Sequence, residues 1–339
     1  MRIVSGIQPT GNLHLGNYLG AIRNWVAMQD QVAASGGQSL YFLADLHALS
    51  QPHVPAELGA NCREMIAALL ACGIDPAKSI VFNQAQVPQH AELQWLLTGT
   101  ARMGWLNRMT QWKDKSGKNR EGQSVALFTY PVLQAADVLI YQATHVPVGD
   151  DQKQHLELAR DIAQKFNNDY CSENAPVFTL PEAIIPPEAA RIMSLRDGSA
   201  KMSKSDPSDM SRINLTDDAD AIMAKVKKAK TDPEPLPSDK SGLAGRAEAA
   251  NLVGIYAALA GTSVAAVLSE FGGEGFGKFK PALGELLIEK LAPINARFVE
   301  LRRDKAALDA VLRDGSAKAR ALAVPTLEAT YAALGLLRG

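Results

Sequence analysis

The chain has 339 residues, of which 47% are hydrophobic and 21% are charged. This composition is typical of a globular protein, and the length is sufficient for two domains with large cores. The formal net charge of −1 excludes nucleic-acid binding that is driven by the overall charge of the protein.

The cysteines, Cys62, Cys72 and Cys171, form neither a CxxC pair nor a zinc-ligand spacing. We therefore expect no disulfide and no resident metal, and this cysteine usage fits the reducing cytoplasm. We see no apolar run of the roughly 20 residues that span a membrane and no signal-peptide pattern at the N-terminus. The expected location is cytoplasmic.

Short apolar runs alternate with helical patterns in the first half of the chain. Arg2–Gly6, Ser39–Asp45 and Ser79–Gln84 are typical of buried strands, and residues 17–29 and 56–74 between them carry apolar residues at helical spacing. This order predicts an α/β fold with a doubly wound, Rossmann-like parallel sheet. In such sheets, ligands bind at the carboxyl ends of the strands.

The second half of the chain has a different pattern. A polar, basic insertion at about 103–123 interrupts the first pattern, a helix is expected from Asp151, and the chain is expected to be extended around Pro181–Pro187. After a flexible loop, the strand patterns stop and helical patterns continue, beginning with a helix for which Thr216 is the expected N-cap.

These changes predict a catalytic domain over 1–205, with the loop at 196–205, and an all-helical domain over 206–339. The last helices of this second domain are expected to pack back on the first. The glycine-rich segment Gly272–Phe279 nearly matches a phosphate-binding loop but ends in phenylalanine, so we interpret it as a turn between helices.

The stretch "PTGNLHLGNYLG", Pro9–Gly20, follows the first predicted strand. Gly11 and Gly16 allow the backbone to approach a ligand closely, and a helix that begins near Asn17 would point its free N–H groups at a phosphate. His14 lies three residues before Asn17, so both side chains can face one bound group. Taken alone, this stretch fits a plain glycine turn equally well.

A second stretch, "KMSKS" at Lys201–Ser205, favours the nucleotide site. Its ammonium groups lie on a loop rich in small residues, where they can stabilise negative charge that develops on a phosphate leaving group. A solvated surface loop is the alternative for a lone lysine pair, but the order of the two motifs on these elements makes a nucleotide site the better interpretation.

These motifs resemble those of the class I aminoacyl-tRNA synthetases. "HLGN", His14–Asn17, is similar to the first signature of that class, and "KMSKS" matches the second. Within the class, five separate blocks ("SGIQPTGNLHLGNYLGA", "DLHAL", "YPVLQAAD", "VPVGDDQKQHLELARDIAQKFN" and "RIMSL") resemble the bacterial tryptophanyl-tRNA synthetase family. The likeness extends from Ser5 to about Asp206 and is weaker beyond.

The resemblance implies a ligase that joins L-tryptophan to ATP and then passes tryptophan to tRNA(Trp), with Mg²⁺ on the ATP and a homodimeric assembly. The residues that it implies for ATP binding are Gln8, Pro9, Thr10, Gly16, Asn17, Gly149, Asp150, Asp151, Ile192, Lys201, Met202, Ser203, Lys204 and Ser205. Among the catalytic residues, His14 and Asn17 would contact the phosphates, and Lys201 and Lys204 would stabilise the departing pyrophosphate.

The resemblance also implies the tryptophan site. Asp137 would accept the single N–H of indole, and a buried carboxylate excludes side chains that cannot donate to it. Tyr130 and Gln152 would bind the substrate's ammonium and carboxylate groups, and His47 would close the pocket. Gln134 departs from the family pattern, which has methionine at this position, so its effect on the pocket is left open.

Basic clusters at Lys113–Arg120, Lys225–Lys230 and Arg297–Lys305 are candidates for tRNA contacts to phosphate, or are ordinary solvated surfaces. Three alternatives for the function stay open from the sequence. They are a tyrosyl-tRNA synthetase, a nucleotidyltransferase of the phosphopantetheine or nicotinamide type, and an inactive paralogue that binds RNA.

Overall fold

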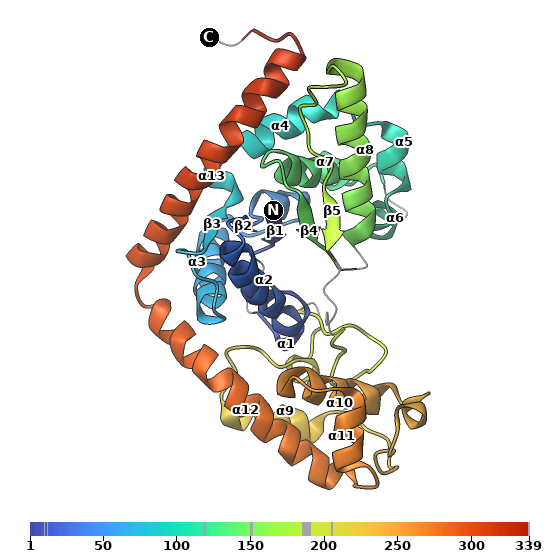
Figure 1. The fold of residues 1–339 in the computed structure, drawn as a ribbon. Coiled ribbons are helices and arrows are strands. Elements are labelled where there is room, and N and C mark those ends of the chain that lie inside the picture. The colour runs from blue at the N-terminus through green and yellow to red at the C-terminus, as the bar shows by residue number, and fades with distance from the viewer. Residues whose placement is uncertain are drawn as a thin grey trace.

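The structure is a computed structural model that describes residues 1–9, 11, 13–117, 120–149, 152–184, 191–204 and 206–337. Its centre is a parallel sheet with the strand order β3-β2-β1-β4-β5 (Figure 1). The strands are β1 (Arg2–Ile7), β2 (Gln38–Leu43), β3 (Ser79–Asn83), β4 (His145–Pro147) and β5 (Glu182–Ile184). The order reverses at β1, which confirms the doubly wound α/β fold.

The predicted strands at the start of the chain are confirmed as β1, β2 and β3. Along β2, Tyr41 and Leu43 enter one apolar core, whereas Leu40 and Phe42 enter the other, so alternate side chains serve opposite faces of the sheet. The expected extended stretch near Pro181 contains β5. β4 was not predicted as a strand, because its three residues are too few to show a period.

Helices cover both faces of the sheet and make up the C-terminal half (Figure 1). They are α1 (Leu15–Asn17), α2 (Arg23–Ala34), α3 (Pro55–Ala71), α4 (Gln89–Thr98), α5 (Met103–Arg108), α6 (Thr110–Ser116), α7 (Val125–Leu139), α8 (Lys153–Tyr170), α9 (Ala219–Lys228), α10 (Ala247–Ala260), α11 (Val264–Phe271), α12 (Phe276–Leu301) and α13 (Lys305–Ala333). A π-helix at Tyr18–Ile22 joins α1 to α2. The insertion at 103–123 contains α5 and α6.

Two apolar cores lie on opposite faces of the sheet. Residues of α2 and α3 contribute to one core together with α10 and α12, and residues of α4, α7 and α8 contribute to the other. α13 packs against β3 and α4, and its Arg320 donates a hydrogen bond to the Gln86 carbonyl oxygen (2.8 Å). The long last helix therefore lies along the sheet edge (Figure 1). The boundary between domains at 205 stays a prediction.

Some predicted element ends are wrong. α9 begins at Ala219 with Asp218 as its N-cap, not Thr216, and the Asp218 carboxylate accepts from the Ala221 N–H. α1 begins at Leu15, two residues before Asn17. The turn predicted over Gly272–Phe279 is confirmed only up to Gly275, because α12 begins at Phe276. Predicted helix ends commonly differ from the observed ones by a few residues.

Within the described ranges, no single helix is long and apolar enough to cross a membrane. α10 and α11 meet the length and composition requirement only as a pair, and they are bent by 108° relative to each other. Both helices contribute buried residues to the apolar core, among them Leu252 and Leu268.

The close contact between α13 and β3 depends on Gly315. A Cβ atom at this position would overlap the backbone of Val81. We expect Gly315→Ala to lower the free energy of unfolding by roughly 1–3 kcal/mol, because overpacking forces the helix away from the strand. Urea unfolding followed by circular dichroism measures this change.

Gly254→Ala is the matched control, because Gly254 lies inside α10 and a Cβ atom there would have no packing neighbour within 4 Å. This variant should be more stable than the parent by roughly 0.5–1 kcal/mol, the helix-propensity difference between the residues. Equal stability of the two variants would contradict the proposed packing of α13.

Candidate active site

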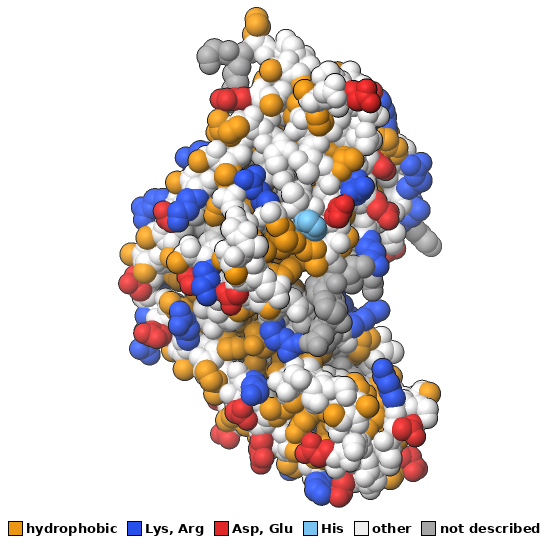
Figure 2. Space-filling model, viewed as in Figure 1, with side chains coloured by type: hydrophobic (Ala, Val, Ile, Leu, Met, Phe, Trp, Pro, Cys, Tyr) orange, Lys and Arg blue, Asp and Glu red, His pale blue; other side chains and the backbone are white. Residues whose placement is uncertain are grey.

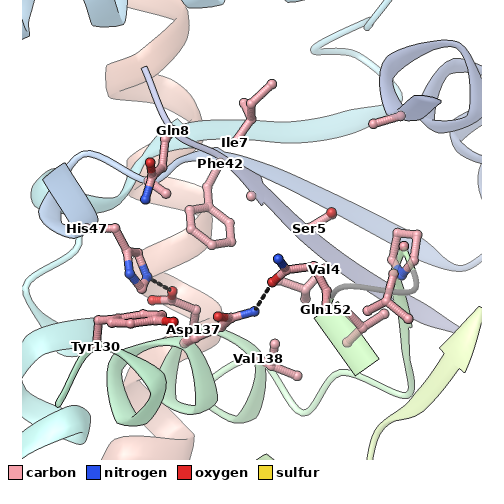
Figure 3. A pocket seen from close by; sticks show the side chains of 18 of the residues that line it. Val4, Ser5, Ile7, Gln8, Phe42, His47, Tyr130, Asp137, Val138 and Gln152 are labelled. Atoms are coloured by element: carbon pink, nitrogen blue, oxygen red, sulfur yellow. Dashed lines mark hydrogen bonds and ion pairs between the residues drawn. The ribbon is translucent and has the colours of Figure 1, made fainter. Parts of the chain in front are cut away.

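A cavity of about 460 Å³ lies at the carboxyl ends of β1 and β4 (Figure 3). Its walls come from β1, the π-helix, α2, α6, α7 and the residues after β4. It is therefore located where the strand order of the sheet reverses, which is the usual ligand position in this class of fold. The predicted site residues that line it are Gln8, His47, Tyr130, Asp137, Gly149 and Gln152.

Asp137 on α7 is the most buried charged group of the cavity, with 1% of its surface exposed. Its Oδ2 lies 2.8 Å from Nε2 of His47, and its Oδ1 lies 2.7 Å from Nδ1 of His90 and accepts from the Gln84 amide. Burial by itself would raise the pKa of Asp137, but the interactions with His47 and His90 outweigh it and lower the pKa to about 2. Asp137 is therefore an anion at neutral pH.

Tyr130 and His47 lie on the cavity wall next to Asp137 (Figure 3). The edge of one ring faces the other, with their centroids 6.2 Å apart. The Tyr130 hydroxyl donates to Gln111 Oε1 (3.0 Å) and lies 2.8 Å from Nε2 of His155. Burial raises the pKa of Tyr130 to about 12, so its hydroxyl keeps its proton.

Gln134, the position that departs from the family pattern, lies in the same wall. Its amide donates to Oε1 of Gln152 across 3.2 Å (Figure 3). The polar side chain at this position therefore contacts another predicted site residue, and the geometry of the Gln152 amide depends on it.

The apolar wall of the cavity includes Phe42, which sequence reasoning missed. Its ring lies directly over Gly6 on β1, where a Cβ atom would overlap the ring. Trp25 also lines the cavity, and its ring stacks on Tyr41 with centroids 4.9 Å apart. The position of Phe42 near the end of a predicted strand was the signal that could have found it.

His14 is the N-cap of α1 and is buried. Asn17 Oδ1 accepts from the His14 N–H (3.1 Å), and a Cβ atom at Gly16 would lie 3.0 Å from the imidazole ring. Burial, followed by the positive charges of Lys204 and Arg212, lowers the pKa of His14 to about 4. The imidazole is therefore neutral at pH 7, and its Nδ1 has no hydrogen-bond partner in the part of the chain that is described.

The KMSKS segment lies beside the residues around Ile192 and is hydrogen-bonded to them. The Met202 N–H donates to the Ile192 carbonyl (3.0 Å), and Met193 pairs with Lys201 in an antiparallel bridge. The Ile192 carbonyl therefore accepts one hydrogen bond from the KMSKS segment.

Lys204 connects KMSKS to the segment just before HLGN, because it contacts Gly11, which is 193 positions away in the sequence. Its Nζ donates to the carbonyl oxygen of Gly11 across 2.8 Å, and Gly11 has a φ of 78°, which favours glycine. Burial and the nearby positive charge of Arg212 lower the pKa of Lys204 to about 8. Lys201, by contrast, is exposed.

Residues after KMSKS hold the first motif, which the sequence did not indicate. The Leu15 N–H donates to the Ile213 carbonyl (2.8 Å), and the Leu215 N–H donates to the Leu13 carbonyl (2.9 Å). Asn214 between them lies opposite His14 in an antiparallel bridge. The chain that follows the KMSKS loop is therefore attached to the first motif.

Lys225 supports this attachment and was wrongly grouped with the surface cluster Lys225–Lys230. It is 4% exposed, and its Nζ lies 2.6 Å from Asp217 and 2.7 Å from Asp209. Asp217 in turn accepts from the Asn214 N–H. The side chain of Lys225 therefore has a structural role.

Asn251 on α10 is hydrogen-bonded to Met193, the residue after Ile192. Its Oδ1 accepts from the Met193 N–H (2.9 Å), and its Nδ2 donates to the Met193 carbonyl (3.0 Å). A Cβ atom at Gly198 would overlap the backbone at the start of α10, so the loop also lies directly against this helix. No local sequence signal marks Asn251.

The predicted site residues thus form two groups. Those beside the HLGN–KMSKS contact, outside the cavity, are His14, Gly16, Asn17, Ile192, Lys201, Met202, Ser203 and Lys204. Pro9 is buried immediately after Gln8. Thr10, Asp150, Asp151 and Ser205 lie outside the described residues. In the ranges that the structure describes, no group of three or more His, Cys, Asp or Glu side chains could hold a metal ion.

Comparison with known proteins agrees with this geometry. Residues 1–291 match the family described as tRNA synthetases class I (W and Y). The chain is 60% identical to tryptophan–tRNA ligase of Caulobacter vibrioides over 96% of this chain and 93% of that protein. It is 56% identical to tryptophan–tRNA ligase of Mesorhizobium japonicum over 99% of this chain and 98% of that protein.

A solved structure with a similar fold is tryptophanyl-tRNA synthetase from Campylobacter jejuni complexed with ADP and tryptophan. It is 35% identical, has a TM-score of 0.81, and the match covers 99% of this chain and 100% of that chain. The chain therefore belongs to the class I tRNA synthetases of the W and Y family, and within it to the tryptophan–tRNA ligases.

Proposed function

We propose that this chain activates L-tryptophan with ATP, forming tryptophanyl-adenylate and pyrophosphate, and then transfers tryptophan to the 3′ end of tRNA(Trp). The observation that carries the proposal is the buried anion of Asp137 in a cavity that adjoins the HLGN–KMSKS contact. A cavity with apolar wall residues such as Phe42 and with one buried anionic acceptor suits indole, which is flat and has one N–H donor.

The activation step needs charge stabilisation more than a base. The tryptophan carboxylate is already an anion at pH 7, so its oxygen can bond to the α-phosphorus as the bond to pyrophosphate breaks. Lys201 and Lys204 are the proposed cations for the leaving group, and the neutral His14 is a proposed hydrogen-bond donor to the phosphates. The substrate ammonium would lie near Tyr130 and Gln152.

The remaining proposed ATP contacts involve residues near the start of α1, near the KMSKS loop and after β4. We assign the adenine and ribose contacts to Gly16, Asn17, Ile192 and Gly149, with Gln8 and Pro9 beside them. Mg²⁺ would enter as part of the MgATP substrate. Lys115, which lines the cavity from α6, adds a cation that the sequence marked only as part of a basic cluster.

We further propose that the helical half after residue 205 binds the tRNA anticodon and that the insertion contacts the acceptor stem. Basic side chains are exposed on both, including Lys113, Lys227 and Lys228. In Figure 2, lysine and arginine side chains lie around the central hollow of the face shown, and hydrophobic side chains gather near its middle. A charged, hollowed surface of this kind suits a polyanion.

A homodimer and a cytoplasmic location are also proposals. Large apolar side chains stand exposed on the sheet-bearing half, among them Trp95 (74%), Met103 (68%) and Val125 (75%). Exposed apolar side chains of this size are typical of subunit interfaces.

Amino-acid-dependent ATP–pyrophosphate exchange tests the main proposal. We expect tryptophan to stimulate exchange and tyrosine to have little effect. Asp137→Asn should raise KM for tryptophan about tenfold or more, because it removes the charge and turns a donor toward the donors of His47 and His90.

Asp309→Asn is the control for this exchange experiment, since Asp309 forms a surface ion pair with Arg63 and should leave KM unchanged. Stimulation by tyrosine alone would support a tyrosyl enzyme instead. Absence of any exchange would support an RNA-binding paralogue without activity.

The pKa of Lys204 predicts a pH dependence for anion binding. Lysine is charged below its pKa, so pyrophosphate affinity of the free protein should fall as pH rises through about 8. In Lys204→Arg the guanidinium stays charged, and the fall should be smaller. Calorimetric titration with pyrophosphate between pH 6.5 and 9.5 compares the two proteins, and identical profiles would disprove the role of Lys204.

Charge reversal of Lys227 and Lys228 tests the tRNA surface. We expect the double change to glutamate to reduce tRNA charging and its salt dependence, with pyrophosphate exchange unaffected. Lys78→Glu is the control, because Lys78 lies immediately before the edge strand β3 and not in the helical half. Unchanged charging in the double variant would argue against this surface.

A further inference from the structure

A chain of hydrogen bonds extends behind Asp137, on the side away from the cavity. The Tyr141 hydroxyl lies 2.6 Å from Nε2 of His90, and Nδ1 of His90 lies 2.7 Å from Oδ1 of Asp137. His90 and Tyr141 are each 0% exposed. Among the described residues, neither side chain lines the cavity, so neither can touch a substrate there.

The direction of each hydrogen bond follows from the chemistry of its groups. Burial, and then the negative charge of Asp137, raises the pKa of Tyr141 well above its usual value, so its O–H stays protonated. The ionised carboxylate of Asp137 can only accept, so Nδ1 of His90 carries a proton and donates to it. In this Nδ1–H tautomer, Nε2 accepts from the Tyr141 hydroxyl.

Gln84 adds a second donor to the same oxygen. Its Oε1 accepts from the Leu46 N–H (3.2 Å), which orients the amide so that Nε2 donates to Oδ1 of Asp137. Oδ1 thus receives hydrogen bonds from Gln84 and His90, whereas His47 is the hydrogen-bond partner of Oδ2 among the described residues. An ionised carboxylate can accept about four hydrogen bonds. One acceptor position therefore remains on Oδ2, beside His47 in the cavity wall.

We propose that His90 and Tyr141 are positioning residues for substrate selection. They occupy Oδ1 with a donor of fixed direction, so that Asp137 presents a single acceptor position on Oδ2 to a substrate with one ring N–H. This inference rests on the proposed function and extends it from the carboxylate to the buried pair behind it. It also explains why a fully buried histidine and tyrosine lie on this side of α7.

Other polar groups face Asp137 or the cavity from the elements packed around it. His47 lies in the 3₁₀ turn Leu46–Ser50, while Tyr130 and Lys115 line the cavity from α7 and α6. Asp45 is satisfied separately, because its oxygens accept from the Asn83 amide and the Ala85 N–H (2.8 Å each). In the described residues, only the two histidines and Gln84 are hydrogen-bonded to Asp137.

The test uses two substrates of the same shape. In β-(3-benzothienyl)alanine, sulfur replaces the indole N–H, so the ratio of kcat/KM for tryptophan to that for the analogue reports the hydrogen bond to Asp137. We expect Tyr141→Phe and His90→Leu to lower this ratio about tenfold in the exchange assay, because Asp137 is free to turn or become protonated. KM for ATP should not change.

The pH profile separates positioning from a merely structural role. In the parent protein the ratio should be flat between pH 5 and 8, because Asp137 with a pKa of about 2 stays ionised. In His90→Leu a donor is lost while the burial remains, so the pKa rises and the ratio should fall as the pH is lowered.

His90→Asn is the conservative variant, since its amide nitrogen takes a position close to that of Nδ1 and can donate to Asp137. It should restore much of the ratio that His90→Leu loses. Tyr41→Phe is the matched control. Tyr41 is also fully buried, and its hydroxyl donates to the Trp25 carbonyl. The Tyr41→Phe variant therefore loses a buried tyrosine hydrogen bond that does not involve Asp137.

The outcomes are distinct. If the parent protein shows no tryptophan-dependent exchange, the proposed function fails and this inference fails with it. If the parent protein prefers tryptophan but folded Tyr141→Phe keeps both the ratio and the flat pH profile, only the inference is overturned. An equal loss for both substrates also overturns it, as does failure of His90→Asn to exceed His90→Leu. Tyr141→Phe removes only one oxygen atom, so this variant tests the inference even if the His90 variants do not fold.

Discussion

A buried anion is the constraint on which the arrangement of the cavity depends. Removing a carboxylate from water costs on the order of several kcal/mol unless donors replace the water. Asp137 obtains its donors from three segments that follow β2 and β3, namely His47, Gln84 and His90. These side chains connect α7 to the carboxyl edge of the sheet, so the buried charge organises the wall in which it lies.

The phosphate side of the site depends on long-range contacts of a different kind. Lys204 bonds to the backbone of the first motif, and the Ile213–Leu215 segment pairs with the residues around His14. Lys225 and Asn251, both from the helical half, support these two attachments. The helical half is therefore part of the structural support of the nucleotide side.

How well each feature could be predicted depends on how far apart in the sequence the residues that define it lie. β1, β2 and β3 were predictable because each has five or six residues and contains apolar side chains in succession. β4 has three residues and was missed. Thr216 was wrong as an N-cap because α9 begins two residues later, where the Asp218 carboxylate accepts from the Ala221 N–H. His90 was not singled out, because its partner Asp137 is 47 positions away.

The amino-acid sequence by itself determined the class of fold and the two signature motifs, because motif spacing and local periodicity are properties of contiguous chain. Asp137 was indicated only by the resemblance of its surrounding block to a known family. Tertiary structure decided how these parts act together. The contact of Lys204 with Gly11, the neutral state of His14 and the donors that surround Asp137 all arise from segments far apart in the sequence. Burial and the distances between charges set ionisation and hydrogen-bond direction, and both exist only after the chain has folded.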